Sequence, residues 1–220
     1  MFDKFKPMWG KRPQLKKSYD AVIVGGGLHG LATAYFLATR HGITDVAIIE
    51  KRYIGFGGAG RNTAIVRANQ RTQENVPLYK EALDLWPVLT KELDYNLMFN
   101  NCGNLNLMHS EGAMKAARMT ISSAQFQGVE SHLIDAKEAK ELVPALNISR
   151  DITFPIHGAM FHPPGGVVRH DAVVWGLAEG AAKNGVQIHQ QTEVTAINVE
   201  KGKITGVETD RGNIKTNRVL

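Results

Sequence analysis

The first fifty residues alternate between short apolar runs and a stretch with helical spacing. Residues 19–24 are an apolar run that leads into glycines, which is the pattern of a buried parallel strand. From Leu28 the apolar residues recur at helical spacing, and Gly42 follows as a helix cap. A second apolar run, residues 46–49, ends at Glu50. This order predicts a strand–helix–strand unit with a right-handed crossover.

The middle of the chain shows helical periodicity in three places. Residues 76–93 predict a helix that Pro87 should kink or divide, and residues 111–126 predict a second helix. The sequence Asp135-Ala-Lys-Glu138 resembles a capping box, which predicts a short helix that runs through Val143.

Strand signals accompany these helices. Residues 96–99 and 105–108 are expected to pair as a hairpin around residues 100–103. Strands and helices mixed in this way predict an α+β lobe over residues 76–160, inserted between two parts of a larger domain.

The last part of the chain returns to α/β character. Asp171 is expected to cap the N-terminus of a helix that runs to Asn184, and a strand follows. Three later segments alternate apolar and polar residues between turn residues, which predicts a β-meander. These segments are residues 193–199, 204–209 and 214–220.

Composition adds limits on the class of protein. The 220 residues are 43% hydrophobic and 21% charged, as in an ordinary globular protein, and the net charge is +5. The single cysteine, Cys102, excludes an intramolecular disulfide and suggests a reducing compartment. No apolar run is long enough for a membrane span, and no recognised nucleic-acid module is present.

Part of the excess charge lies in an irregular basic arm over residues 1–18. The basic residues there are Lys4, Lys6, Lys11, Arg12, Lys16 and Lys17. The arm lacks the apolar h-region of a secretory signal, so we predict a cytoplasmic protein. A solvated arm is the simpler interpretation, and a subunit-docking segment is the alternative.

The glycine-rich turn carries the clearest chemical signal. Gly25 permits a tight turn after the strand, Gly27 lets the backbone approach a pyrophosphate, and Gly30 lets helix and strand pack closely. The helix N-terminus favours phosphate, and Glu50 is placed to accept hydrogen bonds from a ribose. A carboxylate there disfavours a 2′-phosphate, so the turn indicates FAD or NAD rather than NADP. His29 is either a polar helix-start residue or a neighbour of the cofactor.

Residues 22–35, followed by Ile49-Glu-Lys, resemble the D-amino-acid-oxidase-like flavoprotein superfamily. More closely, residues 18–220 resemble the N-terminal half of the β subunits of heterotetrameric sarcosine oxidases. The segments that carry this resemblance are residues 59–69, 102–107 and 169–175.

The resemblance implies an α/β fold: a Rossmann-like FAD-binding domain, with a parallel sheet plus β-meander, and part of an inserted α+β substrate lobe. Beyond the arm, we expect the first part of the FAD-binding domain at residues 19–75 and the lobe at residues 76–160. The second part of the FAD-binding domain would be residues 161–220. Because the chain stops inside an expected strand, we expect this domain to be incomplete at its C-terminus, through either fragmentation or truncation.

The resemblance also implies two flavins. FAD would bind non-covalently, and FMN would be attached covalently to His170, with Asp171 placed to orient the imidazole. The alternative role for His170 is that of a polar residue beside a helix cap. No metal site is expected. The implied FAD-binding residues are Gly25, Gly27, Leu28, His29, Gly30, Glu50, Gly58, Ala59, Arg61, Asn62, Val66 and Val194.

Arg67 aligns with an arginine that binds the substrate carboxylate in related sarcosine oxidases. A guanidinium suits this role because it pairs with both carboxylate oxygens. The alternative is an arginine in a surface ion pair. Monomeric relatives carry a second arginine three residues earlier, where this chain has Ala64, and that difference agrees with the heterotetrameric branch.

The implied activity is oxidation of sarcosine to glycine through an imine, with hydride transfer to FAD. Electrons would pass to FMN and then to oxygen, giving hydrogen peroxide. Implied partners are the sister subunits α, γ and δ, and no nucleic acid or membrane is expected. One alternative is another flavin-dependent amino-acid oxidase or dehydrogenase acting on proline, glycine or dimethylglycine, and a nicotinamide-dependent enzyme is a more distant one. Another is a non-catalytic remnant that binds sister subunits.

Overall fold

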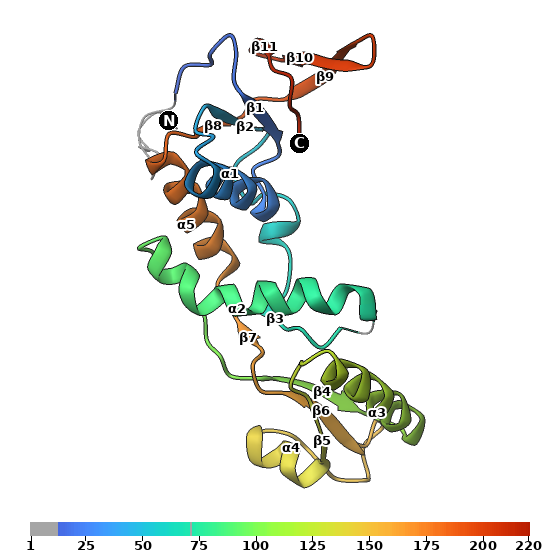
Figure 1. Ribbon diagram of the computed structural model, residues 1–220. Coiled ribbons are helices and arrows are strands. Elements are labelled where there is room, and N and C mark those ends of the chain that lie inside the picture. Colours follow the sequence, from blue (N-terminus) through green and yellow to red (C-terminus); the bar gives the residue numbers. More distant parts are fainter. Residues whose placement is uncertain (1–12, 71) are drawn as a thin grey trace. The chain divides into compact units, whose positions relative to one another are not determined.

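The computed structural model describes residues 13–70 and 72–220, which form two compact units (Figure 1). Unit 1 takes in the described residues up to Thr63, Leu93–Leu97 and Arg169–Leu220. Unit 2 takes in the described residues of Ala64–Glu92, together with Met98–Val168.

The basic arm predicted over residues 1–18 is described only from Pro13 onward. Lys4, Lys6, Lys11 and Arg12 lie outside the described residues. Lys16 forms an exposed ion pair with Asp45, with 2.7 Å between Nζ and Oδ1. This part of the arm therefore contacts the body of unit 1 through its charge.

A parallel sheet is the framework of unit 1. It contains β1 (Ala21–Val24), β2 (Val46–Glu50) and β8 (Gln187–Gln190), in the order β1-β2-β8. The last residues of the chain lie parallel to β1, where Val24 N donates to Leu220 O at 2.8 Å. The parallel pairing of β1 with β2 confirms the predicted strand–helix–strand unit.

The predicted β-meander is also present in unit 1. It consists of β9 (Val194–Glu200), β10 (Lys203–Thr209) and β11 (Gly212–Lys215), all antiparallel, with β10 in the middle. The third strand is shorter than predicted, because the chain leaves the meander after Lys215 and pairs with β1. Val207 and Ile214 pack against one face of the parallel sheet.

Two helices pack against each other in unit 1: α1 (Leu28–His41) and α5 (His170–Lys183). Gly42 caps α1 in the left-handed conformation, as predicted. The prediction that Asp171 caps α5 is wrong. Arg169 occupies the cap position with extended backbone, and Asp171 lies inside the first turn, where its carboxylate is bound by the Arg169 guanidinium.

A second, antiparallel sheet forms the core of the lobe in unit 2. Its strands are β4 (Asn104–Met108), β5 (His132–Asp135) and β6 (Gly158–His162), in the order β4-β6-β5. Helix α3 (Glu111–Phe126) packs on this sheet, and α4 (Ala136–Leu142) begins at the predicted capping box.

The predicted hairpin between residues 96–99 and 105–108 is wrong. Strand β4 pairs with β6, and Asn100 forms a bridge with Val167. The local turn signal around Gly103 is real, because Gly103 has a φ of 80°, but the strand partner comes from far along the chain. A local pattern does not report such a distant partner.

The rest of unit 2 packs around α2 (Val76–Glu92) and a short ladder of β3 (Ile65–Val66) with β7 (Gly166–Val167). The expected division of α2 at Pro87 does not occur, since the helix is continuous across it. Burial of one face of α2 outweighs the hydrogen bond that proline removes. Two 3-10 turns, η1 (Gly58–Gly60) and η2 (Gln73–Asn75), complete the elements.

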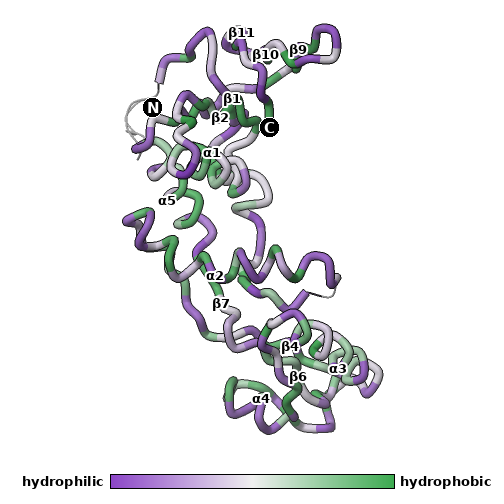
Figure 2. The backbone as a smooth tube through the Cα atoms, viewed as in Figure 1, coloured by the Kyte–Doolittle hydropathy of each residue, from purple (hydrophilic) through white to green (hydrophobic). Residues whose placement is uncertain are grey.

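The predicted α/β fold class, with parallel sheet, meander and α+β lobe, is confirmed. Figure 2 shows hydrophobic residues concentrated on β1 and β2, as expected for buried parallel strands. The compact units divide the chain at other residues than the predicted boundaries at 75 and 160. The compact units are defined by which elements pack together, whereas the predicted boundaries come from where the sequence pattern changes. The predicted domain boundaries therefore stay a prediction.

Candidate functional site

The glycine turn follows β1 as its residue types require. Gly25 has a φ of 112°, a conformation that side-chain-bearing residues rarely adopt. A Cβ atom on Gly30 would lie 2.1 Å from the carbonyl oxygen of Gly25, so helix and turn are in backbone contact there. The turn therefore brings the N-terminus of α1 directly against the end of β1.

A cavity of about 460 Å³ lies at this turn, within unit 1. Residues from the turn and from the loop at η1 line it together: Val24, Gly25, Gly27, Leu28, His29, Gly30, Gly58, Ala59 and Asn62. A Cβ atom on Gly27 or Gly58 would meet nothing within 4 Å, so backbone borders open space at both positions. These features fit a pyrophosphate that approaches backbone N–H groups.

Glu50 closes the turn from the neighbouring strand. Its carboxylate accepts hydrogen bonds from Gly26 N at 2.8 Å and from Arg52 N at 2.7 Å. Each carboxylate oxygen has a further lone pair, so both can accept another hydrogen bond. Glu50 therefore fastens the turn and keeps acceptor capacity for a ribose hydroxyl.

A second cavity of about 270 Å³ in unit 1 contains His170 and Arg61. Arg61 places its guanidinium over the Phe56 ring, 4.4 Å from the ring centroid. His170 begins α5, and its buried Nδ1 has no hydrogen-bond partner among the described residues. Most of the predicted cofactor residues are thus divided between two cavities of unit 1.

Asp171 contributes little to the orientation of His170. Its Oδ1 lies 3.8 Å from His170 Nδ1, whereas both of its oxygens accept hydrogen bonds from Arg169 at 2.9 Å. The Arg169 guanidinium lowers the pKa of Asp171 to about 2. The carboxylate is therefore ionised at neutral pH and committed to Arg169.

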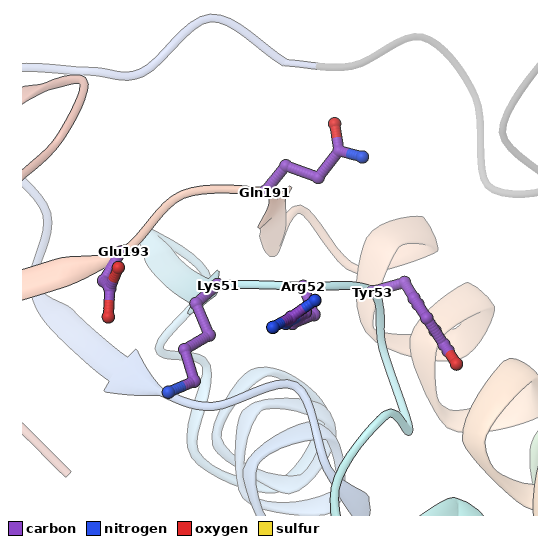
Figure 3. A pocket seen from close by; sticks show the side chains of 5 residues that line it. All are labelled: Lys51, Arg52, Tyr53, Gln191 and Glu193. Atoms are coloured by element: carbon purple, nitrogen blue, oxygen red, sulfur yellow. The ribbon is translucent and has the colours of Figure 1, made fainter. Parts of the chain in front are cut away.

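Three of the predicted cofactor residues line neither cavity. Glu50 ends β2 and Val194 begins β9 in unit 1, and Val66 is buried in β3 of unit 2. Glu193, the residue before Val194, lines a pocket of about 540 Å³ that sequence reasoning missed (Figure 3). It is lined by Lys51, Arg52, Tyr53, Gln191 and Glu193.

The segments that form this pocket are tied together by their backbones. Gln191 N donates to Arg52 O at 2.8 Å, and Thr192 N donates to Glu50 O at 3.0 Å. In Figure 3 the Gln191 side chain points away from the Lys51 segment. Charged residues directly after Glu50 were the available sequence signal, but the meeting with residues 191–193 depends on the pairing of β2 with β8.

Arg67 lies in unit 2 and lines a cavity of about 1120 Å³. Its Nη1 donates to the backbone O of Asn69 at 3.3 Å and to Asn69 Oδ1 at 3.5 Å. No salt bridge joins Arg67 to a carboxylate within the described parts of the chain. The other walls of the cavity come from β4 and α3, with Leu105, Leu107 and Ala117 among them.

His162 contacts the backbone next to Arg67, and sequence reasoning did not identify it. It is fully buried, and its Nε2 lies 3.2 Å from the backbone N of Ala68. Its Nδ1 faces the backbone O of Glu130. Burial is the main cause that lowers the pKa of His162. Nothing near His162 in the sequence marks it, because its partner is 94 residues away.

Residues 13–70 and 72–220 contain no cluster of three or more His, Cys, Asp or Glu side chains that could bind a metal. Over the same residues, no helix combines the length and apolarity that crossing a membrane requires.

The turn, its acidic partner and the loop at η1 can be compared with known proteins. The model of the DAO family, described as FAD dependent oxidoreductase, matches residues 20–220. The chain belongs to this family. The family match agrees with the cavity at the glycine turn and decides for FAD over NAD.

Several known proteins are similar over nearly the whole chain. Sarcosine oxidase subunit beta from an Arthrobacter species is 43% identical over 96% of this chain and 52% of its own length. The Rhodobacter capsulatus subunit beta is 45% identical over 92% of this chain and 49% of its own length. Among solved structures, L-proline dehydrogenase from P. horikoshii superposes with a TM-score of 0.85 at 31% identity, covering 93% of this chain and 52% of that one. The chain thus spans about half the length of these relatives.

Proposed function

We propose that the chain forms the FAD-binding part, with a portion of the substrate lobe, of a flavin-dependent amine oxidase that acts on sarcosine. The observation that carries the proposal is Arg67, a half-buried cation with no salt-bridge partner among the described residues, beside a large cavity. The high identity to sarcosine oxidase β subunits supports the same substrate class.

FAD would be held through the backbone of the glycine turn and the loop at η1. The N-terminus of α1 would favour the pyrophosphate, and Glu50 would accept hydrogen bonds from the ribose. When bound, FAD supplies the acceptor for a hydride, while the protein supplies binding and orientation. In this proposal Val194 contacts the adenine through its backbone.

Arg67 would bind the carboxylate of sarcosine. Its Nη1 is engaged by Asn69, which leaves Nε and Nη2 as the pair that can face two carboxylate oxygens. The apolar side chains from β4 and α3 would exclude water around the methyl group. Arg67 therefore accounts for a preference for amines that carry a carboxylate.

His170 would attach FMN, and electrons would then reach oxygen to give hydrogen peroxide. An imidazole nitrogen without a hydrogen-bond partner, beside a cavity that also contains Arg61, supports this assignment. By the same likeness to subunits of larger enzymes, we propose a cytoplasmic assembly with sister subunits α, γ and δ.

A second candidate function is the oxidation of proline. The structural similarity to a proline dehydrogenase favours it, and Arg67 would bind the proline carboxylate equally well. The two candidates share one mode of carboxylate recognition and differ in the amine that the cavity accepts.

The flavin assignment is tested by acid precipitation of the purified protein. For the wild type, the non-covalent FAD should enter the supernatant while FMN remains in the pellet, and the His170→Ala pellet should contain no flavin. His41→Ala, an exposed histidine at the end of α1, is the matched control and should behave as the wild type. A wild-type pellet without flavin would show that no covalent bond exists.

The substrate is tested by peroxide release with sarcosine, dimethylglycine, proline and glycine, together with dye reduction for a dehydrogenase. Sarcosine should give the highest kcat/KM, and Arg67→Met should raise KM. Turnover of proline with none of sarcosine would replace the first candidate by the second. No turnover of any amine by a flavin-loaded protein would refute both.

A further inference from the structure

The backbone between Arg67 and Asn69 is held by one buried side chain. Ala68 is fully buried, and its N–H donates to Nε2 of His162 at 3.2 Å. On either side of Ala68, Arg67 and Asn69 line the cavity, and the Arg67 guanidinium contacts Asn69. His162 therefore fixes the backbone at Ala68, between two residues that line the cavity.

The two contacts of His162 define its protonation state. A backbone N–H can only donate, so Nε2 must accept and carries no proton. The proton is then on Nδ1, where it donates to the backbone O of Glu130. The charged groups that face the ring are Arg67, whose charge lowers the pKa, and Glu130, whose charge raises it, while burial dominates. His162 is thus a neutral histidine with a defined tautomer.

We propose that neutral His162 is the positioning residue of the substrate-carboxylate site. It accepts the Ala68 N–H and thereby sets the backbone from which Arg67 reaches the carboxylate. An imidazolium at this position would offer a donor to a donor and break the contact. This inference rests on the proposed function of Arg67. It adds that carboxylate binding requires an acceptor for the Ala68 N–H, which His162 Nε2 supplies from 94 residues away.

The test compares two amides at position 162. In His162→Gln the amide oxygen can lie near the Nε2 position and still accept the Ala68 N–H. In His162→Asn the shorter amide lies near Nδ1, so the contact with Glu130 can remain while Ala68 loses its acceptor. Both variants are made in the complete flavin-loaded protein, with Arg67→Met beside them. Affinity for acetate, followed by the flavin spectrum, and steady-state kinetics with sarcosine are measured.

We expect His162→Asn to weaken acetate binding and raise KM by about tenfold, with a smaller change in kcat. His162→Gln should stay within about threefold of the wild type. Equal losses in the two variants, at matched thermal stability and flavin content, would overturn the inference while the proposed function stands. If Arg67→Met leaves acetate binding unchanged, the assignment of Arg67 itself fails, and the inference fails with it.

A second measurement does not depend on whether the variants fold. The nitrogen chemical shifts of the His162 imidazole in the wild-type protein report its tautomer directly. The Nδ1–H tautomer near neutral pH is expected. An Nε2–H tautomer or an imidazolium would refute the proposed acceptor role.

Discussion

The glycine turn of unit 1 and the Arg67 site of unit 2 are proposed to bind anions, and they offer different means of doing so. At the turn, backbone borders the cavity, which the turn and the loop at η1 line together. At Arg67, one side chain supplies the charge, and its support comes from Asn69 nearby and His162 far away. The first site is formed mainly by backbone, and the second depends on side chains.

This difference teaches which changes each site tolerates. A backbone site fails when a new side chain occupies space, whereas a side-chain site fails when a charge or an acceptor is removed. Substitutions at the two sites should therefore differ in kind as well as in size, and the largest effect is expected where backbone meets backbone.

Gly30→Val should damage the turn more than the loss of any side-chain contact at either site. Its Cβ would lie 2.1 Å from Gly25 O, so the backbone must move, at a cost of about 3 kcal/mol or more in the free energy of unfolding. Urea denaturation and bound flavin content measure the effect. Wild-type stability with full flavin content would contradict the close contact.

Arg67→Met should raise KM for sarcosine about 100-fold, because two charge-assisted hydrogen bonds to the carboxylate are lost. Arg67→Lys keeps the charge but lacks the planar pair of donors. Its KM for sarcosine should lie between those of the wild type and Arg67→Met. Steady-state kinetics decide this prediction, and thermal unfolding serves as the folding control. A lysine variant equal to the wild type would show that charge alone suffices.

Gly27→Ala should separate binding from folding at the turn. A Cβ there meets no protein atom within 4 Å and the backbone is extended, so stability should change by less than about 1 kcal/mol. FAD affinity should fall about tenfold or more, because the methyl group enters the space where a pyrophosphate approaches the backbone. Titration of the flavin-free protein with FAD measures it, and unchanged affinity would place the pyrophosphate elsewhere.

Carboxylate affinity should depend on pH through His162. The pKa of its imidazole is lowered by burial below the ordinary value of 6.5, so the neutral form and its contact to Ala68 are complete above that value. The stability that depends on this neutral form is lost progressively as pH falls from 6.5 towards the lowered pKa. Because acetate binds the folded protein, its affinity should weaken as pH falls through the lowered pKa in the wild type but not in His162→Gln. A parallel pH profile in the two proteins would assign the effect to another group.

The smallest effect is expected at the Arg169–Asp171 ion pair. Because Arg169 is exposed, Arg169→Gln should lower the free energy of unfolding only slightly. The pKa of Asp171 should rise from about 2 towards its ordinary value of 3.8. The contribution of the pair is therefore present above pH 3.8 and lost as pH falls towards 2. An NMR titration of Asp171 tests this. If the pKa of Asp171 stays at about 2 in the variant, backbone hydrogen bonds and not Arg169 cause the low value.

The elements that sequence reasoning predicted well are those that local chemistry determines. The glycine turn, the β-meander and the Asp135 capping box depend on residues that are near each other in the chain. The N-cap of α5 was misplaced because Arg169 binds the carboxylate that would have capped the helix.

The remaining errors and omissions come from distant partners. Strand β4 was assigned to a neighbouring segment, whereas it pairs with β6. His162 carries no local motif, and its importance follows only from the approach of β6 to Ala68. The pocket at Lys51 likewise needs the pairing of β2 with β8. Sequence patterns report spacing along the chain, whereas these features depend on contacts between residues that are far apart in the sequence.

The carboxylate of Glu50 limits how the cofactor preference of this turn can evolve. A change to NADP would favour removal of the negative charge, but that substitution also removes the acceptor for Gly26 N and Arg52 N. The first mutational step towards NADP would therefore loosen the loop before any new phosphate contact exists. Selection would have to cross an intermediate that binds either nucleotide poorly, so the fastening of the loop acts as an evolutionary barrier that preserves the preference.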